Sequence, residues 1–106
     1  MGKPLDPTHD HRVSLKAASE LARRHRLSGA HRASDSGAFN SKPVTELLSQ
    51  PGCVGLRIYH GRSATGEPAI ILVGVDAKGN DMTEGVLLDV HLPCPPFCSD
   101  DNALNS

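Results

Sequence analysis

Bulky aromatic side chains are scarce in this sequence. Its 106 residues contain Phe39, Tyr59 and Phe97 and no tryptophan. A hydrophobic core must therefore consist mainly of valine, isoleucine, leucine and alanine, and the apolar area that it buries is modest. A chain of this length usually forms one domain. We expect one small core, which a partner chain, a metal ion or a disulfide helps to stabilise.

Long apolar runs are absent as well. No stretch approaches the roughly 18 to 20 apolar residues of a membrane-spanning helix, and the N-terminus lacks the apolar region of a secretory signal. The sequence therefore predicts a cytoplasmic protein with no membrane contact. Three cysteines are an odd number, so a secreted disulfide framework would leave one thiol over. Reduced thiols or a metal ion fit a cytoplasmic chain better.

The motifs that mark common enzyme active sites are missing too. The sequence has no glycine-rich phosphate loop, no Gly-x-Ser-x-Gly turn and no His-Glu-x-x-His helix. The acidic segment 76–84 does not have the spacing of a calcium-binding loop. We therefore predict that the protein is not an enzyme.

What the sequence does have is an uneven distribution of charge. The formal net charge is only -1, but residues 1–41 carry seven Lys or Arg against four Asp or Glu, and residues 42–106 carry four against eight. A basic arm is therefore joined to an acidic body. This asymmetry favours contact between the arm of one copy and the body of a neighbouring copy, or between arm and body of one chain.

The arm is predicted to form an extended lead-in and then a helix at residues 14–27. Ser14 is a typical N-cap, and Gly29 stands where a C-terminal capping glycine is expected. At about 100° per residue, one arc of this helix is apolar and includes His25, which we expect to be packed. The other members of that arc are Leu15, Ala18, Leu21 and Ala22.

A second arc of the same helix is a basic stripe, which consists of Arg12, Lys16, Arg23 and Arg26. The stripe is a solvated face, a contact for an acidic protein surface, or a contact for phosphate or nucleic acid. Nucleic acid is disfavoured because the total charge is nearly neutral and no aromatic side chains lie nearby for base stacking. We predict these four residues as the partner-binding residues.

The body follows a small, polar linker at residues 28–40, so we divide the chain into an arm with linker, 1–40, and a body, 41–106. A helix is predicted at 41–48 with Ser41 as its N-cap. Alternation at 53–59 and a continuous apolar run at 69–75 predict two strands that pair as an antiparallel hairpin. A turn at 76–81 and a third strand at 85–92 complete the pattern.

The predicted fold class is therefore α+β. It has a small three-stranded, mainly antiparallel sheet, one or two helices, and an extended N-terminal arm. Such a sheet leaves two open edges in a monomer, and open edges favour pairing with a second chain.

The most informative stretch is the segment Pro93-Cys94-Pro95-Pro96-Phe97-Cys98, which we call the clip. Proline restricts its own backbone and that of the residue before it, so the clip should be a stiff loop with two thiols. Three interpretations stay open: a Cys94–Cys98 disulfide or redox pair, reduced thiols packed as small apolar groups, or a zinc site. The zinc ligands would be Cys53, His91, Cys94 and Cys98.

A resemblance rests on the sequences Pro51-Gly52-Cys53-Val54-Gly55 at the start of a strand, the clip, and Asn102-Ala103-Leu104-Asn105-Ser106 at the end. On these motifs the body, residues 42–106, resembles a group of small uncharacterised bacterial proteins. The resemblance implies no activity that can be carried over to this chain.

The sequence as a whole therefore predicts a non-enzymatic interaction or self-assembly protein, in which the basic arm docks on an acidic neighbouring body. The expected partners are further copies of the chain or a larger protein assembly. No cofactor is expected unless zinc is bound. The alternatives are a structural zinc module and a thiol-disulfide redox or disulfide-stapled protein.

Overall fold

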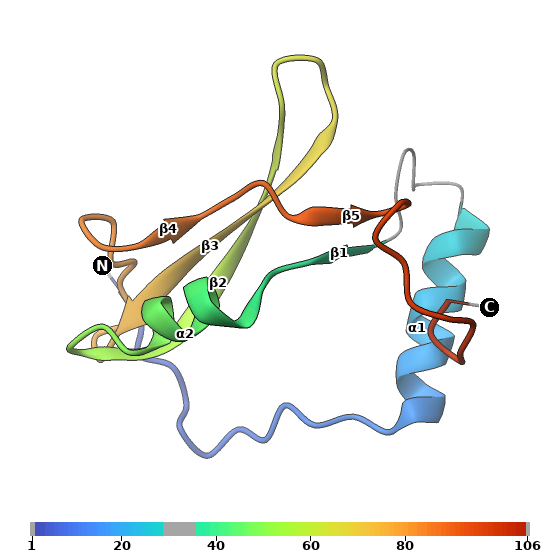
Figure 1. Cartoon of the computed structure of the whole chain (residues 1–106). Coiled ribbons are helices and arrows are strands. Elements are labelled where there is room, and N and C mark those ends of the chain that lie inside the picture. The colour runs from blue at the N-terminus through green and yellow to red at the C-terminus, as the bar shows by residue number, and fades with distance from the viewer. Residues whose placement is uncertain (1, 29–35, 106) are drawn as a thin grey trace. The chain divides into compact units, whose positions relative to one another are not determined.

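A computed structural model describes residues 2–28 and 36–105 of the chain. The elements in these ranges are two helices and five strands, which Figure 1 labels. Strands β2, β3 and β4 form an antiparallel three-stranded sheet, and β1 and β5 form a separate antiparallel pair. The predicted α+β fold with a small antiparallel sheet is confirmed. The elements are α1 (Leu15–Ser28), β1 (Ser36–Ala38), α2 (Ser41–Leu48), β2 (Cys53–Arg62), β3 (Pro68–Asp76), β4 (Leu87–Leu88) and β5 (Leu92–Cys94).

The chain forms two compact units that alternate along the sequence. Unit 1 consists of Met1–Pro7 and Phe39–His91, and unit 2 consists of Thr8–Ala38 and Leu92–Ser106. The chain therefore passes between the units several times, whereas the predicted division into 1–40 and 41–106 has a single crossing. That residues 1–40 and residues 41–106 have separate roles, as arm and body, stays a prediction.

Unit 1 is built on the β2–β3 hairpin. The two strands pair from Cys53 opposite Asp76 to Arg62 opposite Pro68, with a bulge between Cys53 and Gly55. This hairpin was predicted, but β2 was expected to end at Tyr59. The reversal instead occurs after Arg62, where the Ser63 amide donates to the Glu67 carbonyl, because Gly61 fits a strand position as well as a loop.

Helix α2 covers one face of this sheet and buries Leu47 completely. The predicted N-cap Ser41 is wrong by one residue: Asn40 occupies the cap with an extended backbone and makes no side-chain capping bond. Beyond the helix, the Gln50 side chain donates to the Leu47 carbonyl and accepts from the Val86 amide, both at 2.7 Å. Gln50 thereby ties the end of α2 to the segment that leads into β4.

The opposite face of the sheet receives the first residues of the chain. Gly55 pairs with Val75 and Leu56 with Gly74, so Gly55 and Gly74 face opposite sides of the pleated sheet. A Cβ atom on Gly74 would meet Gln50, just beyond α2, whereas a Cβ atom on Gly55 would lie 2.9 Å from Leu5 Cδ1. The extended lead-in therefore begins as a packed part of unit 1.

The third strand is much shorter than predicted. Only Leu87 and Leu88 pair with β3, opposite Val73 and Leu72. The strand ends before Val90, whose φ of 56° lies in the left-handed region that β-branched residues rarely occupy. Residues 89–91 of the predicted strand 85–92 are in no strand, and its last residue, Leu92, begins β5, which pairs with β1 in unit 2.

Unit 2 contains α1, the β1–β5 pair and the C-terminal tail. The Ala17 amide donates to Ser14 Oγ at 3.1 Å, so the predicted N-cap is confirmed. Strand β1 lies inside the segment 28–40 that was predicted as linker, so that prediction is wrong at Ser36–Ala38. The predicted capping residue Gly29 lies outside the described residues. Among those described, the buried apolar side chains all belong to unit 1: Leu47, Leu72, Val73 and Val75.

Candidate functional site

Three residues of the basic stripe are exposed, and the fourth, Arg26, is half-buried against the tail of its own chain. Arg12 forms an exposed ion pair with Asp10 at 3.2 Å, which contributes little because both side chains are largely in water. Lys16 and Arg23 are also exposed. Arg26 is half-buried, and its guanidinium donates to the Leu104 carbonyl at 2.7 Å. Arg26 therefore fastens the C-terminal tail to α1, and the outward part of the stripe consists of Arg12, Lys16 and Arg23.

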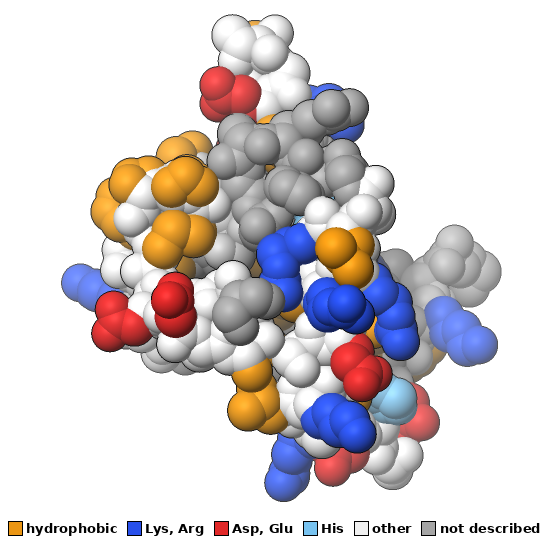
Figure 2. All heavy atoms as spheres, turned by 90° about the vertical axis from the view of Figure 1, so that its right-hand side faces the viewer, with side chains coloured by type: hydrophobic (Ala, Val, Ile, Leu, Met, Phe, Trp, Pro, Cys, Tyr) orange, Lys and Arg blue, Asp and Glu red, His pale blue; other side chains and the backbone are white. Residues whose placement is uncertain are grey.

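The leucines of α1 are spaced six residues apart, so they point in three directions around the helix, and they remain largely exposed. Leu15, Leu21 and Leu27 have exposed fractions of 63%, 60% and 70%, and α1 contains no buried residue. Figure 2 faces the side of the structure that carries α1, where basic and apolar side chains share the surface. The predicted apolar arc is therefore only half right, since Ala18 and Ala22 are half-buried while the leucines and His25 are exposed. Periodicity located the apolar positions but carries no information about what covers them.

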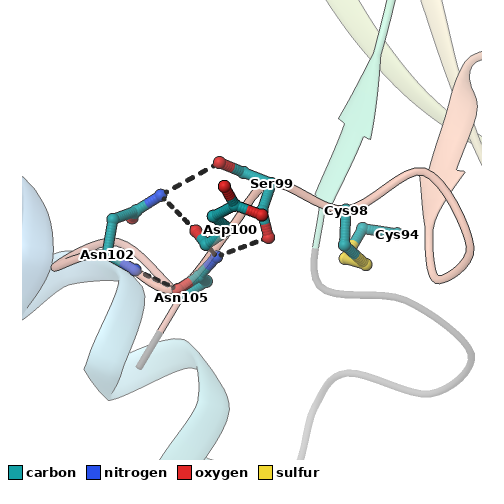
Figure 3. The surroundings of a disulfide bond; sticks show 6 residues. All are labelled: Cys94, Cys98, Ser99, Asp100, Asn102 and Asn105. Carbon is teal, nitrogen blue, oxygen red and sulfur yellow. Dashed lines mark hydrogen bonds between the residues drawn. A yellow bond between two sulfur atoms is a disulfide. The ribbon is translucent and has the colours of Figure 1, made fainter.

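The clip cysteines are joined to each other. Cys94 and Cys98 form a disulfide with their Cα atoms 4.7 Å apart (Figure 3). Cys53 is a free thiol in unit 1, half-buried, with Sγ 3.1 Å from the Gly55 carbonyl. His91 is half-buried beside Phe39, with the ring centroids 6.4 Å apart.

The predicted zinc ligands are thus only partly brought together. In this oxidised form Cys94 and Cys98 offer no thiolate to a metal ion. Within 2–28 and 36–105, no group of three or more His, Cys, Asp or Glu side chains is placed to hold a metal. The zinc module stays a prediction for a reduced form of the chain.

The tail after the clip is ordered by its own side chains, as Figure 3 shows. The Asn102 side-chain amide donates to Ser99 Oγ and to the Asp100 carbonyl, and the Asn105 amide donates to the same carbonyl at 3.1 Å. The Asn102 backbone amide in turn donates to Asn105 Oδ1. Asparagine side chains often bond to nearby backbone in this way, so the density of Asn, Asp and Ser after Cys98 was a signal that the sequence analysis missed.

A side-chain cluster in unit 1 was missed as well. Asp81 accepts hydrogen bonds from Arg57, at 2.5 Å, and from the Tyr59 hydroxyl. The bond from Tyr59 and the positive charge of Arg57 lower the pKa of Asp81 below its ordinary value of 3.8. The bond to Asp81 raises the pKa of Tyr59 above 10.0. The cluster fastens the turn before β4 to β2, and nothing in the local sequence around Asp81 indicates its two partners.

Comparisons with protein-family models, with curated proteins and with solved structures find no match to this chain. The resemblance of residues 42–106 to small bacterial proteins therefore stays a prediction. Neither of the helices described is long and apolar enough to cross a membrane.

Proposed function

We propose that the chain is a non-enzymatic interaction protein that assembles with further copies of itself, and that α1 is the element that docks. The observation that carries this proposal is the exposure of Leu15, Leu21 and Leu27 on a helix with no buried residue. A helix of 14 residues gains most of its stability from packing an apolar face. Because the three leucines point in different directions, each would add a single apolar contact to a partner that also meets the basic residues of the arm.

Charge supports an acidic surface as the partner. Lys16 and Arg23 on α1 and Arg12 just before it are exposed, while residues 42–106 carry eight acids against four basic residues. Unlike charges steer association and disfavour wrong partners. A neighbouring copy supplies both the acidic surface and the arm, so each copy would dock on the next.

The test compares native mass for the wild type and two charge-reversed variants. Lys16→Glu with Arg23→Glu should weaken self-association at least tenfold, because each substitution turns an attraction into a repulsion. Lys42→Glu with Lys78→Glu changes the net charge equally but makes the acidic body more acidic, so its association should be at least as strong as that of the wild type. Association of the wild type should also weaken as salt is added. If the variant with Lys16 and Arg23 reversed has the same native mass as the wild type, docking through α1 is contradicted.

The disulfide supports a second candidate, a disulfide-stapled or thiol-disulfide protein. Disulfides are rare in the cytoplasm, so the expected cytoplasmic location predicts free Cys94 and Cys98 in cells. Thiols are counted in protein that is alkylated at the moment of lysis. Three free thiols would mean that Cys94 and Cys98 are reduced in cells, and one would mean that their disulfide is formed. Metal analysis of the reduced chain tests the zinc module, for which about one tightly held zinc ion per chain is expected.

A further inference from the structure

Strand β2 lies at an open edge of the sheet. The order of the sheet is β2-β3-β4, so β2 pairs on one side only. From Val54 to Arg62, no backbone hydrogen bond from any described segment other than β3 reaches this strand. An open edge presents unpaired N–H and C=O groups that can bind another strand.

The hydrogen-bond pattern identifies which residues carry those unpaired groups. The Ser63 amide donates to the Glu67 carbonyl, so hydrogen-bonded pairs recur at every second position back along the hairpin. On β3, the Gly74 carbonyl accepts from Met82, which shows that Gly74 turns away from β2. The β2 residues that pair with such positions of β3 likewise point their backbone N–H and C=O groups away from β3, toward the open edge. They are Leu56, Ile58, His60 and Arg62.

This edge has few of the features that protect edges in other proteins. Between Leu56 and Arg62 there is no proline and no lysine, and the bulge lies at one end, between Cys53 and Gly55. Ile58 and Tyr59 are 53% and 45% exposed.

The far half of the hairpin has little support from the rest of the sheet. Beyond Leu72, β4 no longer pairs with β3, so the end of the hairpin is a two-stranded ribbon (Figure 1). An isolated two-stranded ribbon is only marginally stable in water. A further strand along β2 would stabilise it.

We propose that β2 pairs antiparallel with β2 of a second copy, over Leu56–Arg62, around a two-fold axis near Tyr59. The outward positions of β2 are symmetric about Tyr59, so the same strand of a second copy presents matching unpaired groups, and charge selects the antiparallel orientation. Arg57 is turned onto Asp81, which leaves Arg62 as the other cation of the paired stretch. Antiparallel pairing places the two Arg62 side chains at opposite ends, about 20 Å apart at 3.4 Å per residue, whereas parallel pairing would set them side by side. This contact is separate from docking through α1.

The test uses proline at an outward position. His60→Pro removes an amide that donates to no described group, so the monomer keeps every β2–β3 hydrogen bond. In the Lys16→Glu, Arg23→Glu background, where docking through α1 is weakened, the dissociation constant of the β2 dimer should rise at least tenfold for His60→Pro and should not change for the matched variant His60→Ala. Mass is measured by light scattering at increasing concentration, and circular dichroism checks the fold. A His60→Pro variant that dimerises as tightly as this background would overturn the proposal.

Two further measurements keep the outcome decisive. If His60→Pro does not fold, Ile58→Lys replaces it, because it sets two cations close to the proposed axis and should also weaken the dimer at least tenfold. Amide exchange at Ile58 and His60 should slow as wild-type concentration rises, and exchange that stays fast at millimolar concentration would overturn the pairing. Reversal of Lys16 and Arg23 should leave this dimer intact, so failure of either proposed contact is recognised separately.

Discussion

Asp81 is the acceptor on which two side chains of β2 converge. It accepts from Arg57 and Tyr59, and its pKa lies below 3.8 in the folded chain. A carboxylate whose pKa is lower when folded stabilises the fold above its unfolded pKa, and that contribution disappears as pH falls through the folded pKa. The pH dependence from Tyr59 has the opposite sign. Its pKa is raised in the folded chain, so it stabilises the fold below pH 10.0, and that contribution is lost as pH rises through the pKa of the folded state.

This cluster gives a prediction for pH dependence. Tyr59→Phe removes the bond that contributes most to lowering the pKa of Asp81, so NMR titration of the carboxyl carbon should show that pKa rise toward 3.8. Asp81→Asn should lower the urea midpoint at neutral pH and reduce the loss of stability below pH 3.8. Glu84→Gln, at an exposed position, is the control for the removal of one carboxylate. An unchanged acid limb in Asp81→Asn would show that the cluster does not stabilise the turn.

At the scale of elements, the start of the chain behaves as a packed strap on unit 1. A Cβ atom on Gly79 would lie 1.9 Å from the Lys3 carbonyl oxygen, and Gly79 is buried with φ at 84°. Gly66 has nearly the same φ, 87°, but open space around it. The two glycines therefore separate the cost of backbone conformation from the cost of displacing the strap.

The matched pair gives a prediction for this strap. Gly66→Ala should destabilise the chain by about 1 kcal/mol, the cost of a left-handed alanine. Gly79→Ala has the same backbone cost and also forces the first residues off the turn, so we expect a loss of at least about 2 kcal/mol. Urea denaturation measures both. Equal losses would mean that the contact between Lys3 and Gly79 contributes nothing to stability.

The same scale shows which elements the sequence could predict. The β2–β3 hairpin and both helices are encoded by local periodicity and caps, and they were predicted with errors of a few residues at their ends. An apolar run cannot show where it stops pairing, so the run at 85–92 was predicted as one strand although it divides between two sheets. The contacts of Asp81 with Tyr59 and of Lys3 with Gly79 join distant segments and leave no local pattern. The candidate interaction residues were predicted as an arc, but the binding of Arg26 to the tail depends on tertiary structure.

At the scale of the whole molecule, each of the two units is stabilised internally by a different kind of interaction. The described apolar side chains that are fully buried lie in unit 1, whereas unit 2 depends on the Cys94–Cys98 disulfide, the Arg26 bond to Leu104 and the asparagine contacts of the tail. Closing a five-residue loop with a disulfide contributes about 2 kcal/mol in the chain-entropy account. That amount is substantial for a unit whose described residues include no buried apolar side chain.

Reduction should therefore loosen unit 2 and leave unit 1 intact. Hydrogen exchange in reductant is expected to accelerate by up to about 30-fold in peptides from 92–105 and 15–28, which is the factor that about 2 kcal/mol represents in an opening equilibrium. Peptides from β2 and β3 should keep their protection. Cys94→Ala with Cys98→Ala should reproduce the effect without reductant, and Cys53→Ser should respond to reductant like the wild type because Cys53 is free. Equal acceleration in both units would show that they open together and that the disulfide stabilises the whole chain.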